Sequence, residues 1–256
     1  MQLNSNNIFY KNFNNHKENL PHIIWAHGWG QNHEILLPLA NSFTNFTNNW
    51  LIDLPGFGNS KQPDSIWGSQ EYTHAIADWI SNNLPPNSIK IWVGHSFGGK
   101  IGINLAAQYP KLINGLFLIA ASGIPKPRSL SQKIIIYSKI KMFKLFKHFK
   151  YANKFKHKFG SPDYKNANQH MRSILVKIIH ENLSNLATQI VCPTELIYGE
   201  KDQDTPILIG QKLNKLINNS KLHIITKQDH YTILTNAQHQ IVYLLKKFID
   251  NIKLLC

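Results

Sequence analysis

Ser96 stands in the pattern G-x-S-x-G, which the sequence fills as Gly94-His95-Ser96-Phe97-Gly98. An apolar run ends at Val93, and a helical pattern follows the motif. The two glycines allow a tight, strained turn that lifts the serine hydroxyl above the edge of a sheet, at a helix N-terminus. A neutral serine is a weak nucleophile and needs an adjacent general base. The pattern therefore predicts that Ser96 is the nucleophile of an acyl-transfer reaction.

The general base should be an imidazole that a carboxylate holds in one tautomer. The chain has 13 histidines. His27 and His95 flank glycine-rich turns, where we expect them to hold loops by hydrogen bonding. His230 lies in a short loop between a late apolar run and the last helical pattern, which puts it at the same sheet edge as Ser96. His230 is therefore the predicted base.

These residues need a scaffold, and short apolar runs alternate with helical patterns along the chain. Several runs are apolar at successive positions, as strands buried on both faces of a parallel sheet must be. Strand–helix alternation at this spacing predicts an α/β fold, with a mostly parallel central sheet flanked by helices. Ile8–Phe13 is expected to be an edge strand. The other predicted strands are His22–Ala26, Trp50–Asp53, Ile89–Val93, Leu116–Ala120, Glu195–Tyr198 and Leu222–Ile225, and the predicted helices are Glu71–Leu84, Gly98–Tyr109, Pro206–Ile217 and Asn236–Ile252.

The alternation stops for about sixty residues after Gly123. Residues 124–186 contain helical patterns and no convincing strand, which indicates a helical insertion and not a separate domain. The core is then formed by residues 1–123 and 187–256. A chain of 256 residues is long enough for one large domain of this kind.

Four motifs beside the serine turn together resemble the α/β-hydrolase superfamily. His27-Gly28-Trp29-Gly30 is similar to its oxyanion loop, and Asp53–Ser60 resembles its D-x-P-G-x-G-x-S turn. Gly199–Asp202, with Pro206 four residues later, resembles the loop that carries the acid, and Asp229-His230 resembles the histidine loop. The motifs occur in the family's order, and the helical insertion sits where the family has its cap.

The resemblance implies a Ser–Asp–His triad in that chain order. Glu200, Asp202 and Asp204 share one loop, and the family's spacing to Pro206 selects Asp202 as the acid. Asp204 has the alternative role of a helix N-cap, because Thr205-Pro206 follows it. The backbone N–H groups of Trp29 and Phe97 are the implied oxyanion hole. The side chain of Trp29 extends toward the substrate or packs against the cap.

The implied activity is a serine hydrolase that cleaves a carboxylic ester through an acyl-enzyme intermediate. Thioester, lactone and amide cleavage use the same residues. The rival class is a non-catalytic binding protein with the same fold. A serine instead of an aspartate at the turn argues against the dehalogenases and epoxide hydrolases of the superfamily that the chain resembles. No H-E-x-x-H, Cys-x-x-Cys or P-loop pattern occurs, so no metal and no cofactor are expected.

The formal net charge of +14 is concentrated in one segment. Residues 126–158 contain eleven basic residues and no acidic one. One interpretation is a cap helix with solvated lysines, since Met142, Leu145, Phe146 and Phe149 recur at helical spacing. The others are a surface that attracts an acidic acyl carrier protein and a helix on an anionic membrane surface. Nucleic acid is not expected, because no base-reading element is present.

The compartment is predicted from what the chain lacks. Its two cysteines cannot form a disulfide framework, and no stretch of about 18 apolar residues predicts a membrane span. The polar N-terminus has no secretory apolar region. The cytoplasm is the expected location.

Overall fold

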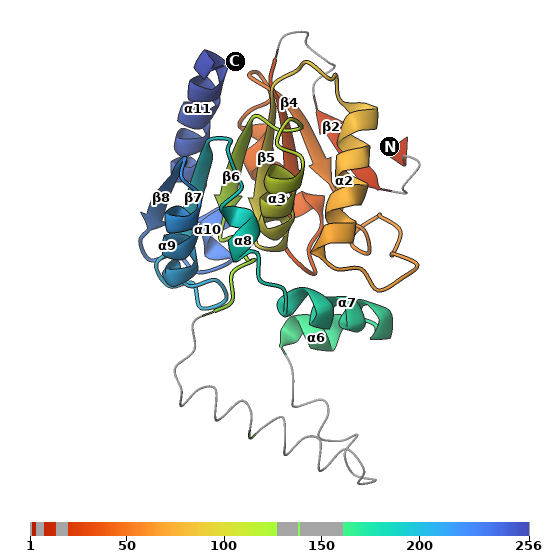
Figure 1. The fold of residues 1–256 in the computed structure, drawn as a ribbon. Helices are drawn as coiled ribbons and strands as arrows, with labels where there is room; N and C mark the ends of the chain where they lie inside the picture. Colours follow the sequence, from red (N-terminus) through yellow and green to blue (C-terminus); the bar gives the residue numbers. More distant parts are fainter. Residues whose placement is uncertain (1, 4–7, 14–19, 127–137, 139–160, 256) are drawn as a thin grey trace, which may run out of the picture.

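A computed structural model describes residues 2–3, 8–13, 20–126, 138 and 161–255. Within these ranges, eight strands form one sheet in the order β1-β2-β4-β3-β5-β6-β7-β8 (Figure 1). Neighbouring strands from β4 to β8 along this order are parallel, whereas β1 and β2 are antiparallel to their neighbours. The bounds are β1 (Gln2–Leu3), β2 (Phe9–Phe13), β3 (His22–Ala26), β4 (Asn48–Ile52), β5 (Lys90–His95), β6 (Gly115–Ile119), β7 (Thr194–Gly199) and β8 (Ser220–Ile225).

The predicted α/β class with a mostly parallel central sheet is confirmed. The prediction of Ile8–Phe13 as an edge strand is wrong, because Gln2 and Leu3 pair with Tyr10 and Phe9 on its outer side. A strand of two residues is too short to show an alternating pattern in the sequence, so periodicity could not reveal it.

Helices cover both faces of the sheet (Figure 1). One apolar cluster joins alternate strand residues such as Ile24, Trp92 and Leu196 to α2 (Ser69–Asn83), α3 (Phe97–Gln108), α8 (Ser184–Ala187) and α9 (Ile207–Leu216). A second cluster joins the intervening strand residues to α1 (Leu37–Asn41), α10 (Thr232–Thr235) and α11 (Gln238–Leu255), with the 3-10 helix η1 (His33–Leu36) beside them. Both faces of the parallel strands β3 to β7 are thus buried, which explains their continuous apolar runs, whereas the edge strand β8 is partly exposed.

The predicted helical insertion, residues 124–186, is described in part. It contains α6 (Pro162–Asn166), α7 (Gln169–Ile179) and part of α8. Helix α7 is amphipathic and buries Met171, Ile174 and Ile178 against the core. Figure 1 shows α6 and α7, in green, beyond one end of the sheet. Residues 127–137 and 139–160 lie outside the described ranges, and with them nearly all of the basic segment 126–158.

No helix in the described ranges is both long and apolar enough to span a bilayer.

Candidate active site

Three side chains from three loops meet beyond the carboxyl ends of the parallel strands. Ser96 follows β5, Asp202 follows β7 and His230 follows β8. His230 Nε2 lies 2.9 Å from Ser96 Oγ, and His230 Nδ1 lies 2.7 Å from Asp202 Oδ2. All three are residues that the sequence singled out, although 134 positions separate Ser96 from His230. The arrangement can remove a proton from the hydroxyl, since Nδ1 donates to the carboxylate and leaves Nε2 free to accept.

The turn at Ser96 is strained. Ser96 has φ +50° and ψ −104°, outside the regions that non-glycine residues favour. A Cβ atom on Gly98 would lie 2.2 Å from the carbonyl oxygen of Ala26, and one on Gly94 would lie 2.5 Å from the carbonyl oxygen of Gly98. Only glycine fits at either place, so the motif lets β5 and α3 meet closely enough to expose the hydroxyl.

Asp202 is buried and accepts four hydrogen bonds. Its Oδ1 accepts the backbone N–H groups of Asp204 and Thr205, both at 2.8 Å. Its Oδ2 accepts from His230 and, at 2.8 Å, from the Thr205 hydroxyl. Burial acts to raise the pKa of Asp202, but the hydrogen bonds and the charge of His230, together with Thr205, outweigh it and hold the pKa below its ordinary value. The carboxylate therefore stays ionised beside the imidazole.

The other two carboxylates of the loop occupy different places. Asp204 is exposed and contacts Asp202 through its backbone N–H. Glu200 accepts the backbone N–H of Lys227 at 2.9 Å. Helix α9 begins at Ile207 with Pro206 at the N-cap position, so the alternative role of Asp204 as a helix cap is wrong.

Thr205 is a residue of the site that the sequence analysis missed. Its hydroxyl lies 2.8 Å from Asp202 Oδ2, 3.0 Å from the carbonyl oxygen of Ala120 and 3.2 Å from His230 Nδ1. It thereby connects the acid loop to the end of β6. A threonine three positions after the candidate acid is a signal for such a local turn, because its N–H and hydroxyl can both reach the carboxylate.

The two predicted oxyanion donors face the same space. Trp29 lies in the loop after β3, Phe97 is the first residue of α3, and both line the cavity that contains Ser96. Within the described ranges, neither backbone N–H has a hydrogen-bond acceptor. The Trp29 ring packs edge-on against Phe57 and Phe97, with centroids 4.8 and 5.4 Å away. N–H groups without an acceptor are the kind of donors that can stabilise developing negative charge.

His27 and His95 hold these loops in place. His27 Nε2 accepts the backbone N–H of Leu54 at 3.0 Å, so its Nδ1 carries the proton and donates to the carbonyl oxygen of Gly28 at 2.7 Å. His95 Nε2 lies 3.0 Å from the carbonyl oxygen of His230, to which it donates. Burial lowers the pKa of His27 to about 4 and that of His95 to about 3, the latter with help from the charge of His230. Both rings are therefore neutral near pH 7.

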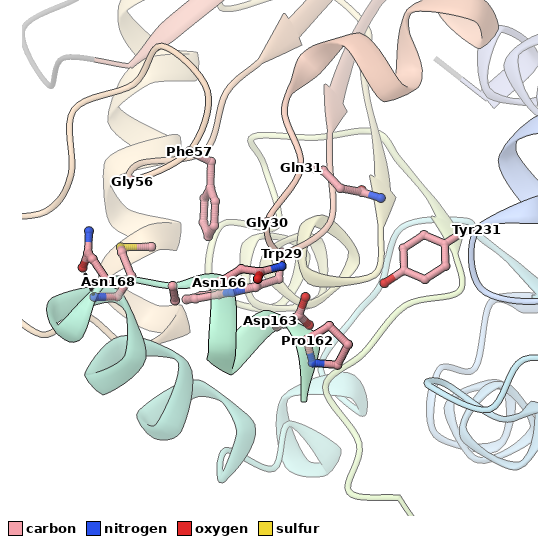
Figure 2. Close-up of a pocket in the computed structure, with 12 residues that line it drawn as sticks. Trp29, Gly30, Gln31, Gly56, Phe57, Pro162, Asp163, Asn166, Asn168 and Tyr231 are labelled. Atoms are coloured by element: carbon pink, nitrogen blue, oxygen red, sulfur yellow. Dashed lines mark hydrogen bonds between the residues drawn. The ribbon is translucent and has the colours of Figure 1, made fainter. Parts of the chain in front are cut away.

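Two adjoining cavities open at the site. The first, of about 220 Å³, contains Ser96 and His230 and has an apolar wall from α7, formed by Leu175, Ile178 and Ile179. The second, of about 430 Å³, lies between the Trp29 loop, Phe57 and α6 (Figure 2). Four residues line both cavities, namely Trp29, Gln31, Asp163 and Tyr231. The two cavities therefore adjoin at these residues.

Comparison with known families gives one match of direct relevance. A family model described as the alpha/beta hydrolase fold matches residues 21–159 of the 256. The matched range is more than half of the chain and includes the strands β3 to β6, the serine turn and the Trp29 loop.

Three similar curated proteins share a name. The chain is 35% identical over 125 residues to a pimeloyl-[acyl-carrier protein] methyl ester esterase of Shewanella woodyi, which covers 43% of this chain and 44% of the relative. A relative of the same name from Shewanella oneidensis is 39% identical over 105 residues, or 40% of this chain and 35% of the relative. One from Wigglesworthia glossinidia brevipalpis is 28% identical over 255 residues, with 88% and 94% covered. The chain thus aligns with less than half the length of the first two relatives.

Solved structures share the fold. A lipase-esterase related protein from Clostridium acetobutylicum superposes with a TM-score of 0.71 at 19% identity, over 94% of this chain and 99% of its own. An esterase from Exiguobacterium antarcticum gives 0.72 at 16% identity, over 95% of each chain. At such identities the likeness concerns the fold alone.

Proposed function

Because this chain belongs to the α/β-hydrolase family, we propose that it is a serine hydrolase that cleaves a carboxylic ester, with Ser96 as nucleophile, His230 as general base and Asp202 as the acid. The observation that carries the proposal is the unbroken hydrogen-bond chain from Ser96 through His230 to Asp202, with distances of 2.9 and 2.7 Å. Each of these groups has the chemistry that its role needs.

The reaction proceeds in two halves. In the first, His230 Nε2 takes the proton of Ser96 while Oγ attacks the ester carbonyl, and the imidazolium then protonates the departing alcohol. The product of this half is an acyl-enzyme on Ser96. In the second, His230 takes a proton from water, the hydroxide attacks the acyl carbonyl, and the proton returns to Ser96 as the carboxylic acid leaves. Asp202 stabilises the imidazolium in both halves.

The tetrahedral intermediates carry a negative oxygen that the N–H groups of Trp29 and Phe97 would stabilise. Donors that are fixed in position before the reaction each lower the activation barrier by about 3 kcal/mol in such sites. Support comes from the position of Phe97 at the first turn of α3, since a helix N-terminus adds a favourable dipole. The strained turn at Ser96 holds the nucleophile between these donors and His230.

A carrier-bound ester is a second, more specific candidate substrate. The curated relatives are named as esterases of an acyl-carrier-protein ester, and residues 126–158 carry eleven basic residues and no acidic one. A segment of this charge would attract an acidic carrier protein. An anionic membrane surface is the alternative partner of the same segment. Both partners stay predictions. The same holds for the helical cap formed by residues 124–186 and for the cytoplasmic location.

The test is turnover of p-nitrophenyl esters graded by acyl length, measured with the wild type and with Ser96→Ala. The proposal predicts saturable hydrolysis by the wild type and a loss of about 10⁶-fold in kcat in the variant. A folded wild type that hydrolyses none of the esters would support the rival class, a binding protein with the same fold.

A further inference from the structure

The second cavity, beside the one that contains Ser96, is lined by polar side chains to which the proposed reaction assigns no role. Figure 2 shows the Asp163 side chain between Trp29 and Tyr231, and all three residues line both cavities. Phe57 and the Trp29 ring supply apolar wall, and Asn166 adds an amide at the rim. The cavity shares Trp29, Gln31, Asp163 and Tyr231 with the cavity that contains Ser96, so it adjoins the place where the proposed ester would react.

Asp163 is a half-buried carboxylate without a partner in the described part of the chain. No described residue donates a hydrogen bond to either of its side-chain oxygens, or forms an ion pair with it. The nearby cation Arg172 is committed elsewhere, because its guanidinium donates to the backbone carbonyls of Tyr164 and Lys165 at 2.8 and 2.9 Å. A carboxylate left open toward a cavity can accept hydrogen bonds from whatever occupies it.

The charge around Asp163 is negative. Asp204 lines the first cavity together with Asp163, and neither carboxylate forms an ion pair with a described residue. Burial raises the pKa of Asp163, and the charge of Asp204 raises it further. The Tyr231 pKa is raised by burial and then by Asp163 and Asp204. A second carboxylate brought into this space would be repelled, whereas a hydroxyl or amide N–H would be bound.

We propose that the second cavity is a subsite for an uncharged, hydrogen-bond-donating part of the substrate, such as an amide or a hydroxyl, and that Asp163 selects it over a carboxylate. The inference rests on the proposed ester hydrolysis at Ser96 and specifies its substrate. A cationic group is the less favoured occupant, because the net charge of +14 opposes the approach of cations to the molecule.

The experiment uses ester pairs of equal shape that differ in charge. Methyl esters of adipic, suberic and sebacic acid are prepared with the far end as a free carboxylate or as the isosteric carboxamide. An ω-ammonium ester of each length forms a third arm. The readout is the ratio of kcat/KM for carboxamide over carboxylate at pH 8, measured on one protein preparation so that any general loss of activity cancels.

At the chain length that reaches the second cavity, the wild type should prefer the carboxamide about tenfold or more. Asp163→Asn should bring the ratio to within about threefold of unity, since it removes the charge and keeps the shape. If Asp163→Asn does not fold, Asp163→Ser replaces it in the same measurement. Asp250→Asn, an exposed carboxylate on α11, is the matched control and should leave the ratio unchanged.

Two results would overturn the subsite while leaving the esterase intact. One is a ratio near unity at every length with the wild type, and the other is an unchanged ratio in Asp163→Asn and Asp163→Ser. Preference for the ω-ammonium ester over the carboxamide would overturn the choice of an uncharged ligand. Failure of the proposed function looks different, because p-nitrophenyl acetate would then not be hydrolysed at all.

Discussion

Ser96, His230 and Asp202 depend on one another, because each supplies what the next one needs. The carboxylate is held by Thr205 and the backbone, and it fixes the imidazole through a 2.7 Å contact. The imidazole in turn lies 2.9 Å from the hydroxyl. Losses of catalytic groups that act as a unit do not add. This dependence separates a catalytic arrangement from three polar residues that merely share a loop region.

The first prediction compares the two aspartates of the acid loop. Asp202→Asn should lower kcat about 10⁴-fold, because the amide leaves the imidazole in the wrong tautomer. His230→Ala should lower kcat by as much as Ser96→Ala does. Asp204→Asn is the matched change, and we expect less than about a tenfold loss from it, since its side chain makes no contact with His230 through a hydrogen bond. Steady-state kinetics with p-nitrophenyl acetate measures all four. A larger loss in Asp204→Asn than in Asp202→Asn would contradict the choice of acid.

The sequence motifs identified the three residues of this hydrogen-bond chain but not all of the contacts that hold them in place. Ser96, Asp202 and His230 could be found because each follows a strand in a recognisable motif. The sequence predicted that His95 holds a loop by hydrogen bonding, but not that its partner is the carbonyl oxygen of His230, 135 positions away. Asp163 was missed for a similar reason, since only the packing of α6 beside the Trp29 loop brings it to the cavity.

The second prediction concerns pH and the two buried neutral histidines. Their pKa values fall from about 6.5 to about 4 for His27 and about 3 for His95. The unfolded chain therefore binds more protons than the folded one between these values and 6.5, so the free energy of unfolding falls as pH falls through that window. The slope is about 1.4 kcal/mol per pH unit for each histidine.

His95→Gln should remove one of these contributions. Urea unfolding at pH 7 and pH 5 should show that the variant loses about 2 kcal/mol less on acidification than the wild type. His239→Gln is the control, because this histidine is exposed on α11 and should not alter the loss. Equal losses in His95→Gln and the wild type would show that His95 is not held neutral by burial.

At the scale of elements, α7 is the link between the insertion and the core. Lys100 on α3 is 3% exposed, donates to the carbonyl of Ile178 and lies 3.2 Å from Glu181. Glu181 also accepts the backbone N–H of Ser69, at the start of α2, at 2.8 Å. One partly buried ion pair thus joins three helices, and the end of α7 that it holds forms the apolar wall of the cavity that contains Ser96.

The third prediction breaks this link. Lys100→Met should lower the free energy of unfolding by about 2 kcal/mol, because Glu181 is left without its cation but can still be partly hydrated. It should also raise KM for an octanoyl ester more than for an acetyl ester, since the wall of the cavity loosens. Lys177→Met removes an exposed pair with Glu71 from the same helix and should cost at most about 0.5 kcal/mol. Equal effects of the two substitutions would show that the buried pair does not position α7.

The helices that the sequence predicted are those with a long amphipathic repeat, such as Glu71–Leu84, found as α2. The short helices α1, α6 and α10 have four or five residues, too few for a repeat to appear. Their formation depends on local caps and on packing, as in α6, where the Ser161 side chain accepts the backbone N–H of Tyr164. The parallel direction of most strands could be predicted from strand–helix alternation alone.

For the whole molecule, charge is the unusual property. Eleven of the 28 basic residues lie in residues 126–158, where no acidic residue balances them. The described cavities, by contrast, are lined by Asp163 and Asp204. A basic segment and acidic residues at the cavities would separate two tasks, the attraction of an acidic partner and the selection of an uncharged substrate group.

The fourth prediction tests the basic segment by charge alone. Changing Lys141, Lys144, Lys147 and Lys150 together to Gln should leave kcat on p-nitrophenyl acetate nearly unchanged, because a small neutral ester is not steered by the field. Binding to an acidic acyl carrier protein, measured by titration calorimetry at low salt, should be lost. In the wild type the same binding should weaken as salt rises. If the wild type binds neither the carrier nor anionic vesicles at low salt, this result would contradict a partner and support the interpretation of the segment as a cap helix with solvated lysines.

The account as a whole depends on Ser96 being a nucleophile that His230 activates. The most direct measurement is intact-protein mass spectrometry after reaction with a fluorophosphonate, followed by peptide mapping. The wild type should gain one adduct, located on Ser96, and folded Ser96→Ala should gain none. Labelling that persists in Ser96→Ala, or a folded wild type that hydrolyses esters without any adduct on Ser96, would contradict the account.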